Sequence, residues 1–275
     1  MRHFSALLLA SLVALSLAAC QPASEPAPEA ESTTAAAESR SAPECHLSMG
    51  WDPWEPYHFS AAGGSVQGLD VELVRMIGER IGCQFDLVQG NWADLLHQLQ
   101  SGGLDVLAGA TRTPERESFA RFSIPYREER FALFVRGDEL DRWAGRPLET
   151  LLEDGFRAGI TQGYVYPEAI SALQSDPRFE GQFIEAPIGE LNFNALLDYR
   201  IDGFFEDPFV AAAIQRRRSA GEAIEPLDLD FGSGEVQLLF SRQSVADEQV
   251  EAVNAALQAM KDDGSYAALL ERYLN

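Results

Sequence analysis

The sequence predicts an α/β protein with two lobes, each built on a mostly parallel sheet flanked by helices. Short apolar segments alternate with segments of helical periodicity after position 44, and the same alternation begins again after position 136. Strand-helix-strand repeats of this kind form parallel sheets with helices on both faces. The chain has 275 residues, 46% of them hydrophobic, which is enough for two such units with cores of their own.

The first unit has a clear order of elements. Apolar positions keep helical spacing from Gly68 onward, and Gly82 is a typical residue to end that helix. A second helix is closed by Gly102. The expected strands are 46–51, 84–89 and 104–109, and the expected helices are 69–81 and 91–101.

The second unit repeats the pattern and is followed by a C-terminal part. Its expected strands are 157–161, 182–186 and 201–205, and its expected helices are 164–174, 191–199 and 208–218. The C-terminal part is expected to hold a strand over 234–242 and helices over 245–263 and 265–274. Two long apolar strands, 131–135 and 236–240, belong to neither unit, so we expect them to cross between the lobes. A ligand in such a fold binds outside the carboxyl ends of the strands, between the lobes.

The N-terminus has the pattern of an export signal. Arg2 precedes an apolar run that ends in small residues, which predicts a signal peptide over residues 1–19. Leu17-Ala-Ala-Cys20 resembles the bacterial lipoprotein signal, in which the Cys becomes the lipidated first residue; the alternative is an ordinary cleavage site with a coincidental Cys. Residues 20–43 would then be the lipidated Cys and a tether, since 17 of the 23 residues after Cys20 are Ala, Pro, Ser or Thr. This predicts a periplasmic or cell-surface protein anchored to a bacterial membrane.

Cys45 and Cys83 are the two remaining cysteines. Each begins a predicted strand, and one helix lies between the two strands. In a right-handed strand-helix-strand unit these strands can be parallel neighbours, which places both cysteines at the same sheet edge. Disulfides persist outside the cytoplasm, so we expect a Cys45–Cys83 bridge rather than two free thiols.

Charge and motifs exclude several classes of function. The chain has 21 Lys and Arg against 43 Asp and Glu, a net charge of −22, which disfavours nucleic acid as a partner. The sequence has no HExxH, GxSxG, Walker or GxGxxG motif. The histidines after the leader, His46, His58 and His97, do not have the spacing of a zinc site. We therefore expect no metal, no cofactor and no catalytic residue.

One segment offers a site for an anion. After a predicted strand come Gly109, which permits close backbone approach, and the hydroxyl of Thr111. Thr113 is a plausible N-cap with Pro114 behind it, and Arg116 provides a planar fork of donors. Free backbone N–H groups and an Arg fork together suit a carboxylate. The alternative is a well-capped helix with surface arginines.

Three stretches carry a family resemblance. GLDVELVRMIGERIGCQFDLV, NWADLLHQLQSGGLDVLAGATRTPERESFARFSIPY and the terminal DGSYAALLERYLN resemble the family 3 extracellular solute-binding proteins of polar amino acid ABC transporters. The resemblance implies the periplasmic-binding-protein fold, with two α/β lobes joined by two hinge strands that close on a ligand. It places residues 44–129 and 234–275 in lobe 1 and residues 130–233 in lobe 2.

The resemblance also implies roles for single residues. Arg116 matches the arginine that pairs with the ligand α-carboxylate, with Thr111 and Gly109 as hydrogen-bonding partners beside it. Asp207 matches the second-lobe acid that receives the α-ammonium, although Pro208 after it also suits an acid at a helix N-terminus. Trp54 and Trp92 match the aromatic walls around the ligand side chain, although either is compatible with a place in the core.

The chain departs from the family pattern at several positions. The family usually has Gly-Thr in the second-lobe loop, where this chain has Gly163-Tyr164. An acid or small polar residue is common at the position of Trp51, and an apolar residue at that of Arg112. We expect Arg112→Ala to alter ligand preference and Arg116→Ala to abolish carboxylate binding. Many aromatic residues fall near the predicted cleft, which suits an aromatic or extended ligand. They are Trp51, Trp54, Tyr57, Trp92, Tyr126, Tyr164 and Tyr166.

The sequence therefore predicts a lipid-anchored, monomeric binding protein that captures a small carboxylate-bearing ligand, an amino acid or derivative, for an ABC importer. Two alternatives remain. One is an enzyme similar to cyclohexadienyl dehydratases on the same scaffold, with Glu206 as the candidate general acid. The other is a sensory subunit that reports the ligand to a membrane protein without transport.

Overall fold

The structure is a computed structural model that describes residues 45–218 and 223–274. The predicted signal peptide (1–19), the lipidated Cys20 and the tether up to residue 43 lie outside the described residues.

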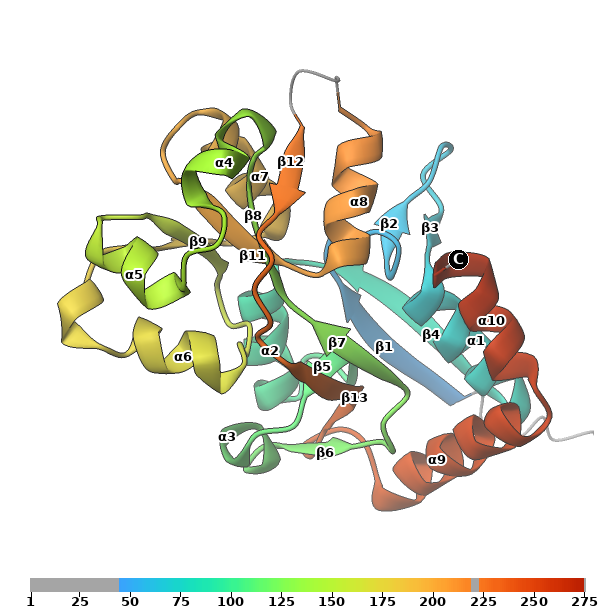
Figure 1. Ribbon diagram of the computed structural model, residues 1–275. Helices are drawn as coiled ribbons and strands as arrows, with labels where there is room; N and C mark the ends of the chain where they lie inside the picture. Colours follow the sequence, from blue (N-terminus) through green and yellow to red (C-terminus); the bar gives the residue numbers. More distant parts are fainter. Residues whose placement is uncertain (1–44, 219–222, 275) are drawn as a thin grey trace, which may run out of the picture. The chain divides into compact units, whose positions relative to one another are not determined.

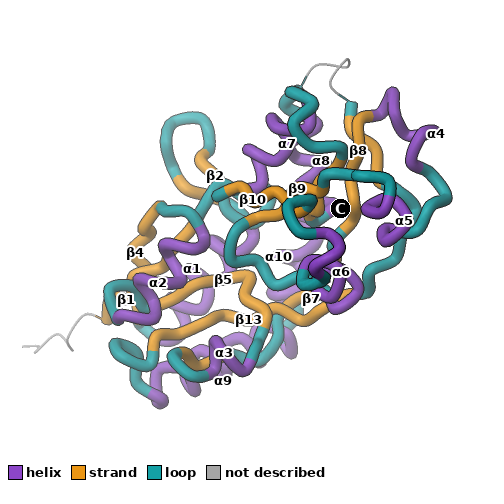
Figure 2. Tube along the Cα trace, turned by 90° about the vertical axis from the view of Figure 1, so that its left-hand side faces the viewer, coloured by secondary structure: helices purple, strands orange, loops and turns teal. Residues whose placement is uncertain are grey.

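The first sheet has the strand order β4-β1-β5-β13-β6, and β7 pairs with β13 beyond this path (Figures 1 and 2). Its strands are β1 (Cys45–Trp51), β4 (Cys83–Gln89), β5 (Val106–Thr111), β6 (Ala120–Phe122), β7 (Arg127–Arg130) and β13 (Ser233–Ser241). Strands β4, β1 and β5 are parallel, whereas β13 runs antiparallel to β5, β6 and β7. A short hairpin, β2 (Phe59–Ser60) with β3 (Val66–Gln67), precedes the first helix.

Helices cover both faces of this sheet (Figure 1). On one face lie α1 (Leu69–Ile81), α9 (Asp247–Asp262) and α10 (Ser265–Leu274), and on the other lie α2 (Trp92–Ser101) and α3 (Pro114–Glu117). The side chains of β5 alternate between the faces: Val106 and Ala108 pack with the first group of helices, and Leu107 packs with α2. We call this sheet with its helices the first lobe.

The second sheet has the order β10-β9-β11-β8-β12. Its strands are β8 (Ala132–Arg136), β9 (Ala158–Thr161), β10 (Phe183–Ala186), β11 (Gly203–Glu206) and β12 (Ile224–Pro226). Its helices are α4 (Leu140–Trp143), α5 (Leu148–Glu153), α6 (Glu168–Gln174), α7 (Gly189–Leu197) and α8 (Pro208–Arg216), with 3-10 turns at Gly137–Glu139 and Pro177–Phe179. Phe204 and Phe205 point to opposite faces, into the core under α7 and α8 and the core under α5 and α6 respectively. This sheet with its helices is the second lobe.

The predicted fold class is confirmed, but the sheets are mixed rather than mostly parallel. Each sheet contains three parallel strands, β4-β1-β5 and β10-β9-β11, next to strands that run antiparallel to them. The chain comes from the other lobe directly into β8 in the second sheet and into β13 in the first. It therefore enters each sheet at the carboxyl ends of the parallel strands, and β8 and β13 run in the opposite direction to those strands.

The two strands predicted to cross between lobes are each part of one sheet. Strand β8 pairs with β11 and β12 in the second sheet, and β13 pairs within the first. The chain passes between sheets at Phe131, between β7 and β8, and at residues 227–232, between β12 and β13.

Helix ends follow the predicted caps, with one exception. Gly82 and Gly102 end α1 and α2 in the left-handed conformation, with φ of 69° and 80°. The helix predicted over 164–174 begins only at Glu168. The backbone turns at Gly163, with φ of 76°, and Pro167 disfavours a helical residue before it. Residues 162–167 therefore form a loop.

The predicted disulfide between Cys45 and Cys83 is confirmed. The two residues are direct partners at the start of the parallel strands β1 and β4, with Cα atoms 4.5 Å apart. The bridge therefore closes the strand-helix-strand unit at the end of the sheet away from the carboxyl ends of its parallel strands.

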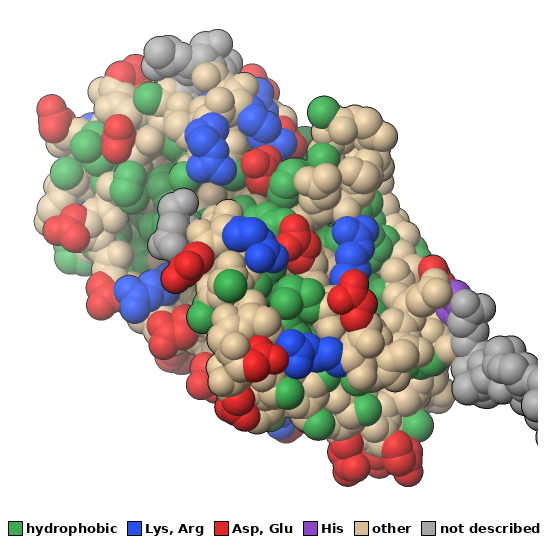
Figure 3. Space-filling model, turned by 90° about the vertical axis from the view of Figure 1, so that its right-hand side faces the viewer, with side chains coloured by type: hydrophobic (Ala, Val, Ile, Leu, Met, Phe, Trp, Pro, Cys, Tyr) green, Lys and Arg blue, Asp and Glu red, His purple; other side chains and the backbone are tan. Residues whose placement is uncertain are grey.

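Within the described residues, no helix has the length and apolar character needed to cross a bilayer. Acidic and basic side chains are interspersed on the face shown in Figure 3. Ion pairs among the described residues include Arg80 with Asp263 at 2.8 Å and Arg272 with Glu72 at 2.6 Å.

Candidate functional site

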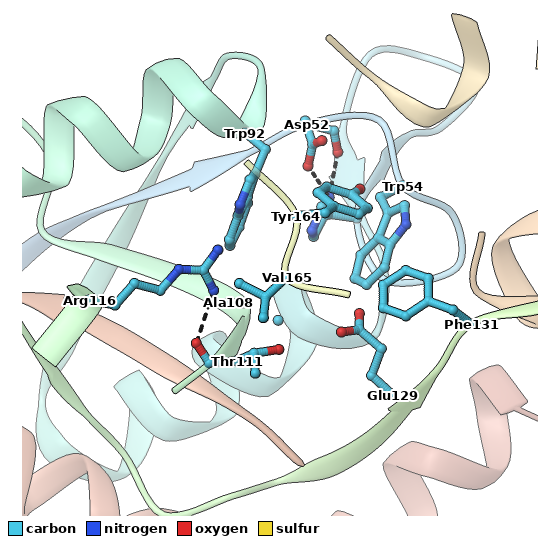
Figure 4. A pocket seen from close by; sticks show the side chains of 12 residues that line it. Asp52, Trp54, Trp92, Ala108, Thr111, Arg116, Glu129, Phe131, Tyr164 and Val165 are labelled. Atoms are coloured by element: carbon cyan, nitrogen blue, oxygen red, sulfur yellow. Dashed lines mark hydrogen bonds and ion pairs between the residues drawn. The ribbon is translucent and has the colours of Figure 1, made fainter. Parts of the chain in front are cut away.

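A cavity lies between the lobes, where β1, β5 and β9 end at their carboxyl ends (Figure 4). Its walls combine charged, aromatic and small residues. They are Asp52, Trp54, His58, Trp92, Ala108, Gly109, Thr111, Arg116, Glu129, Phe131, Tyr164 and Val165. Six of the seven predicted ligand-binding residues are thus brought together, and Asp207 is the exception. The cavity volume is about 20 Å³, close to the room for one water molecule.

Arg116 enters the cavity from the short helix α3. Thr113 caps this helix, because its hydroxyl accepts from the backbone N–H of Arg116 at 3.2 Å, and Pro114 occupies the first helical position. The guanidinium donates from Nη1 to the carbonyl of Thr111 at 2.9 Å and from Nη2 to the carbonyl of Gly163 at 2.8 Å. The arginine therefore reaches from the first lobe to the second.

The charge of Arg116 has no acidic partner at ion-pair distance among the described residues. Its side chain is buried, and burial lowers the pKa of the guanidinium to about 10, so the group stays cationic at neutral pH. The ring of Trp92 lies 5.6 Å from the guanidinium carbon. Carbonyl dipoles do not neutralise a buried charge, so an anion at this position would be strongly stabilised.

Gly109 and Thr111 form the floor beside this arginine. Gly109 has a φ of 70°, and a Cβ there would lie 3.2 Å from the ring of Trp54 and 3.3 Å from Nη2 of Arg127, so the position needs glycine. Its N–H already donates to the hydroxyl of Tyr126 at 2.8 Å.

Four aromatic rings enclose the rest of the cavity. The ring of Tyr164, from the loop after β9, lies 6.2 Å from that of Trp54 and 6.3 Å from those of Trp92 and Phe131. Trp92 also donates from Nε1 to the carbonyl of Gly163 at 3.0 Å. These contacts join residues of both lobes, so the aromatic wall is also part of the contact between lobes.

Asp207 lies outside the cavity wall. One carboxylate oxygen accepts from the N–H groups of Phe209 and Val210 at 2.8 and 3.3 Å and caps α8. The other accepts from the hydroxyl of Tyr57 in the first lobe at 3.1 Å. Both oxygens are therefore engaged, one in capping and one in a contact between lobes.

Glu206, the candidate general acid, is also not part of the cavity wall. Its Oε1 accepts from Nε1 of Trp54 at 3.1 Å and from the N–H of Asp207 at 2.9 Å, and its Oε2 has no hydrogen-bond partner within residues 45–218 and 223–274. Burial raises the pKa of Glu206 to about 8. The carboxyl group is therefore largely protonated at neutral pH.

The structure adds charged residues that the motif reasoning missed. Asp52, His58 and Glu129 line the cavity. Glu129 belongs to β7, the segment REER, in which Arg127 and Glu129 are buried and the two residues next to them are exposed. Period-two alternation in this polar segment was the available signal, because it places Arg127 and Glu129 on one face.

Behind this wall lies a second buried cation, Arg127. Its guanidinium carbon is 3.9 Å from the centre of the Tyr57 ring and 5.1 Å from that of Trp54. The charge of Arg127 interacts electrostatically with the carboxyl groups of Asp70, Glu129 and Asp207. Among the described residues there is no cluster of His, Cys, Asp or Glu side chains that could hold a metal ion.

A two-lobed α/β fold with a charged and aromatic cavity between the lobes defines the class of the periplasmic binding proteins. The model of the bacterial extracellular solute-binding proteins, family 3, matches residues 47–275. The chain belongs to this family, as the sequence resemblance predicted.

Individual relatives are distant. The L-cystine-binding protein TcyA of Bacillus subtilis is 22% identical over 207 residues, which cover 75% of this chain and 72% of that protein. An ancestral arginine-binding protein bound to arginine superposes with a TM-score of 0.72 at 23% identity, over 84% of this chain and 98% of that one. The ancestral amino acid-binding protein AncCDT-1, a precursor of cyclohexadienyl dehydratase, gives a TM-score of 0.70 at 24% identity, over 84% and 96% of the two chains.

Proposed function

We propose that this protein captures a small carboxylate-bearing ligand, an amino acid or a derivative, between its two lobes and delivers it to an ABC importer. Arg116 pairs with the ligand carboxylate, next to Thr111 and Gly109, and Trp54, Trp92 and Tyr164 enclose the remainder. The lobes correspond to residues 44–129 with 234–275 and to residues 130–233. The protein acts as a monomer and catalyses no reaction.

One observation carries this proposal. The guanidinium of Arg116 lines the cavity, has no acid within ion-pair distance in the part of the chain that the structure describes, and donates to carbonyl groups of both lobes. A carboxylate that replaced one or both carbonyls would form a charge-assisted pair at the boundary between the lobes. The ligand would then stabilise the closed arrangement by its own contacts.

The ligand class rests on the relatives. Proteins named for binding cystine and arginine are similar to this chain over about three quarters of its length or more. Because the cavity is far smaller than an amino acid, binding requires that the lobes separate or that Tyr164 moves. Hinge-like separation of two lobes is a common route into such sites.

The location follows from the leader. We propose that Cys20 carries the lipid, that residues 21–43 tether the folded part, and that the protein works in the periplasm or at the cell surface. The membrane partner is an ABC permease. Catalysis by Glu206 is not proposed, because its carboxyl group accepts a hydrogen bond from Trp54 and does not line the cavity.

Titration calorimetry of the purified protein with a set of amino acids tests the proposal. For the amino acids that bind, Arg116→Ala should weaken binding by at least about 30-fold, since removing one partner of a buried charge pair costs about 2–5 kcal/mol. Arg112→Ala is the matched control. Arg112 pairs with Glu117 at 3.0 Å and does not line the cavity, so this variant should bind like the wild type, contrary to the sequence-based expectation of altered preference. Equal affinity of the Arg116→Ala variant and the wild type would remove the basis of the proposal.

A further inference from the structure

The cavity has one cationic wall and one acidic wall. Arg116 enters from one side, and the carboxylate of Glu129 points into the space from the opposite side (Figure 4). The carboxylate of Asp52 lines the same cavity from the residue after β1. Two acids therefore face one cation in the space assigned to the ligand.

Glu129 has no hydrogen bond or ion pair with any described residue. The residue is only 8% exposed, and the cavity that it lines has room for about one water molecule, so bulk solvent does not reach its carboxylate freely. Arg127 and Arg116 attract its charge from a distance, while Asp207 and Asp70 repel it. A buried carboxylate of this kind is stable only when it is protonated or when a cation reaches it.

In the described part of the chain, the carboxylate of Asp52 lies next to the imidazole of His58, which is neutral. It is 3% exposed, and its Oδ1 lies 3.6 Å from Nδ1 of His58. The same Nδ1 contacts the backbone carbonyl of Asp52, which accepts but cannot donate, so Nδ1 carries the hydrogen. Burial lowers the pKa of His58 to about 4, so the imidazole is neutral and leaves the charge of Asp52 unbalanced. Its Nε2 is then a further acceptor.

The surroundings do not supply the missing positive charge. Arg127 lies behind the wall against the ring of Tyr57, and its single charge is shared among Asp70, Asp207 and Glu129. Burial raises the pKa of Asp52 and of Glu129 to about 7. Each acid is thus about half protonated at neutral pH, and a bound cation would displace the proton.

We infer that the ligand carries two cationic groups in addition to the carboxylate bound by Arg116, and that Glu129 and Asp52 bind these groups. The ligand class is an amino acid with a cationic side chain. This inference rests on the proposed function and adds the charge of the ligand to it. The faces of Trp54, Phe131 and Tyr164 then serve to contact a cation rather than to select an aromatic ligand.

Pairs of ligands that differ in the charge of the side chain test the inference. L-Arginine and L-citrulline differ chiefly in that a neutral urea group replaces the guanidinium, and L-lysine and N6-acetyl-lysine differ in the charge of the side-chain nitrogen. Calorimetry with the wild-type protein should show at least one cationic member binding about tenfold or more tightly than its neutral counterpart. If the neutral members bind as tightly, or if only neutral or acidic amino acids bind, the inference is wrong while the carboxylate proposal stands.

Agmatine separates the two proposals, because it keeps the guanidinium and an amine but lacks the carboxylate. It should bind far more weakly than L-arginine. If agmatine binds as well as L-arginine, the proposal that Arg116 binds the ligand carboxylate is wrong, whereas the inference that Glu129 and Asp52 bind cationic groups is kept.

Glu129→Gln is the variant that addresses the wall directly, and Glu128→Gln is its matched control on the same strand, with a 67% exposed side chain. Glu129→Gln should weaken the binding of L-arginine by about tenfold, and Glu128→Gln should leave it unchanged. An unchanged affinity for L-arginine in Glu129→Gln contradicts the inference. Should that variant not fold, calorimetry of the wild type in two buffers of different ionisation enthalpy replaces it. Greater net proton release with L-arginine than with L-citrulline supports the inference, and equal release with both contradicts it.

Discussion

The side chain of Arg116 in the first lobe donates to the backbone carbonyl of Gly163 in the second lobe at 2.8 Å. The same carbonyl accepts from Nε1 of Trp92 at 3.0 Å. One peptide group of the second lobe is thus held by two side chains of the first, directly at the wall of the cavity. Separation of the lobes would therefore break contacts of two residues, Arg116 and Trp92, that line the cavity.

Trp92→Phe should favour separation of the lobes. It removes one of the two donors to Gly163 and keeps an aromatic ring, and a buried hydrogen bond contributes about 1 kcal/mol, or about a fivefold change in an equilibrium. Small-angle scattering of the ligand-free variant should give a larger radius of gyration than the wild type. Trp143→Phe is the control, since Trp143, the last residue of α4, is buried in the core of the second lobe and its Nε1 has no hydrogen-bond partner among the described residues. A radius of gyration equal to that of this control would contradict the prediction.

Tyr164→Thr should enlarge the cavity and broaden the range of ligands. The ring of Tyr164 stands between those of Trp54, Trp92 and Phe131, and the remaining volume is about 20 Å³. Removing the ring leaves space for longer side chains, and Thr keeps a polar hydroxyl at this position. A thermal-shift screen should detect ligands that stabilise the variant and not the wild type. An identical ligand list for the two proteins would show that Tyr164 does not limit the site.

The fold was predictable because it depends on local patterns. Apolar spacing and terminal glycines defined α1 and α2, and the strand-helix-strand order brought Cys45 and Cys83 to adjacent strand ends. The mixed direction of the strands was not predictable from these patterns, because the direction of β8 and β13 depends on where the chain crosses between lobes. Helix α6 begins later than predicted because Gly163 and Pro167 both oppose a helix. The prediction followed the apolar spacing and gave these two residues too little weight.

The site was predictable only in part. The motif around Arg116 and the aromatic residues led to one wall of the cavity, because short segments of sequence carry both. Glu129 was missed because it lies in a polar segment that resembles a surface strand. It is buried because this segment, β7, pairs with β13, which no local pattern in the sequence indicates. Asp207 matched a family pattern, but its oxygens are engaged by the N-terminus of α8 and by Tyr57.

The stability of the protein should fall between about pH 6.5 and pH 8. Burial raises the pKa of Glu206 to about 8, whereas a glutamate in an unfolded chain titrates near 4.3. Over this range the folded protein keeps a proton that the unfolded chain has lost, so the free energy of unfolding decreases as pH rises. Asp52 and Glu129, with pKa values of about 7, add to the decrease. His58, with a pKa lowered to about 4, acts in the opposite direction only below about pH 6.5.

Glu206→Gln isolates one part of this effect. The carboxyl group of Glu206 accepts from Trp54 and is repelled by Asp207 and Glu129, so an amide removes a charge that the site does not tolerate. Urea unfolding at several pH values should show a smaller decrease than in the wild type, by at most about 2 kcal/mol over 1.5 pH units. Glu225→Gln, at an exposed position of β12, is the control. A pH profile that is the same in both variants would exclude Glu206 as a source.

Replacement of Cys45 and Cys83 by serine should destabilise the protein without affecting ligand binding. The bridge spans a sequence separation of 38, for which the loss of loop-closure entropy in the unfolded chain is worth about 4 kcal/mol. The bridge lies at the start of β1 and β4, away from the carboxyl ends where the cavity is. Urea unfolding measures the loss, and calorimetry on the folded variant should give an affinity within about twofold of the wild type. A large loss of affinity in the folded variant would refute the separation of bridge and site.

The most direct measurement of the central claim is a crystal structure of the protein with a bound amino acid. The account predicts a ligand carboxylate with its oxygens about 2.7–3.0 Å from guanidinium nitrogens of Arg116, between the first lobe and the loop that contains Tyr164. A ligand whose carboxylate lies elsewhere, while Arg116 still donates to Thr111 and Gly163, would contradict it.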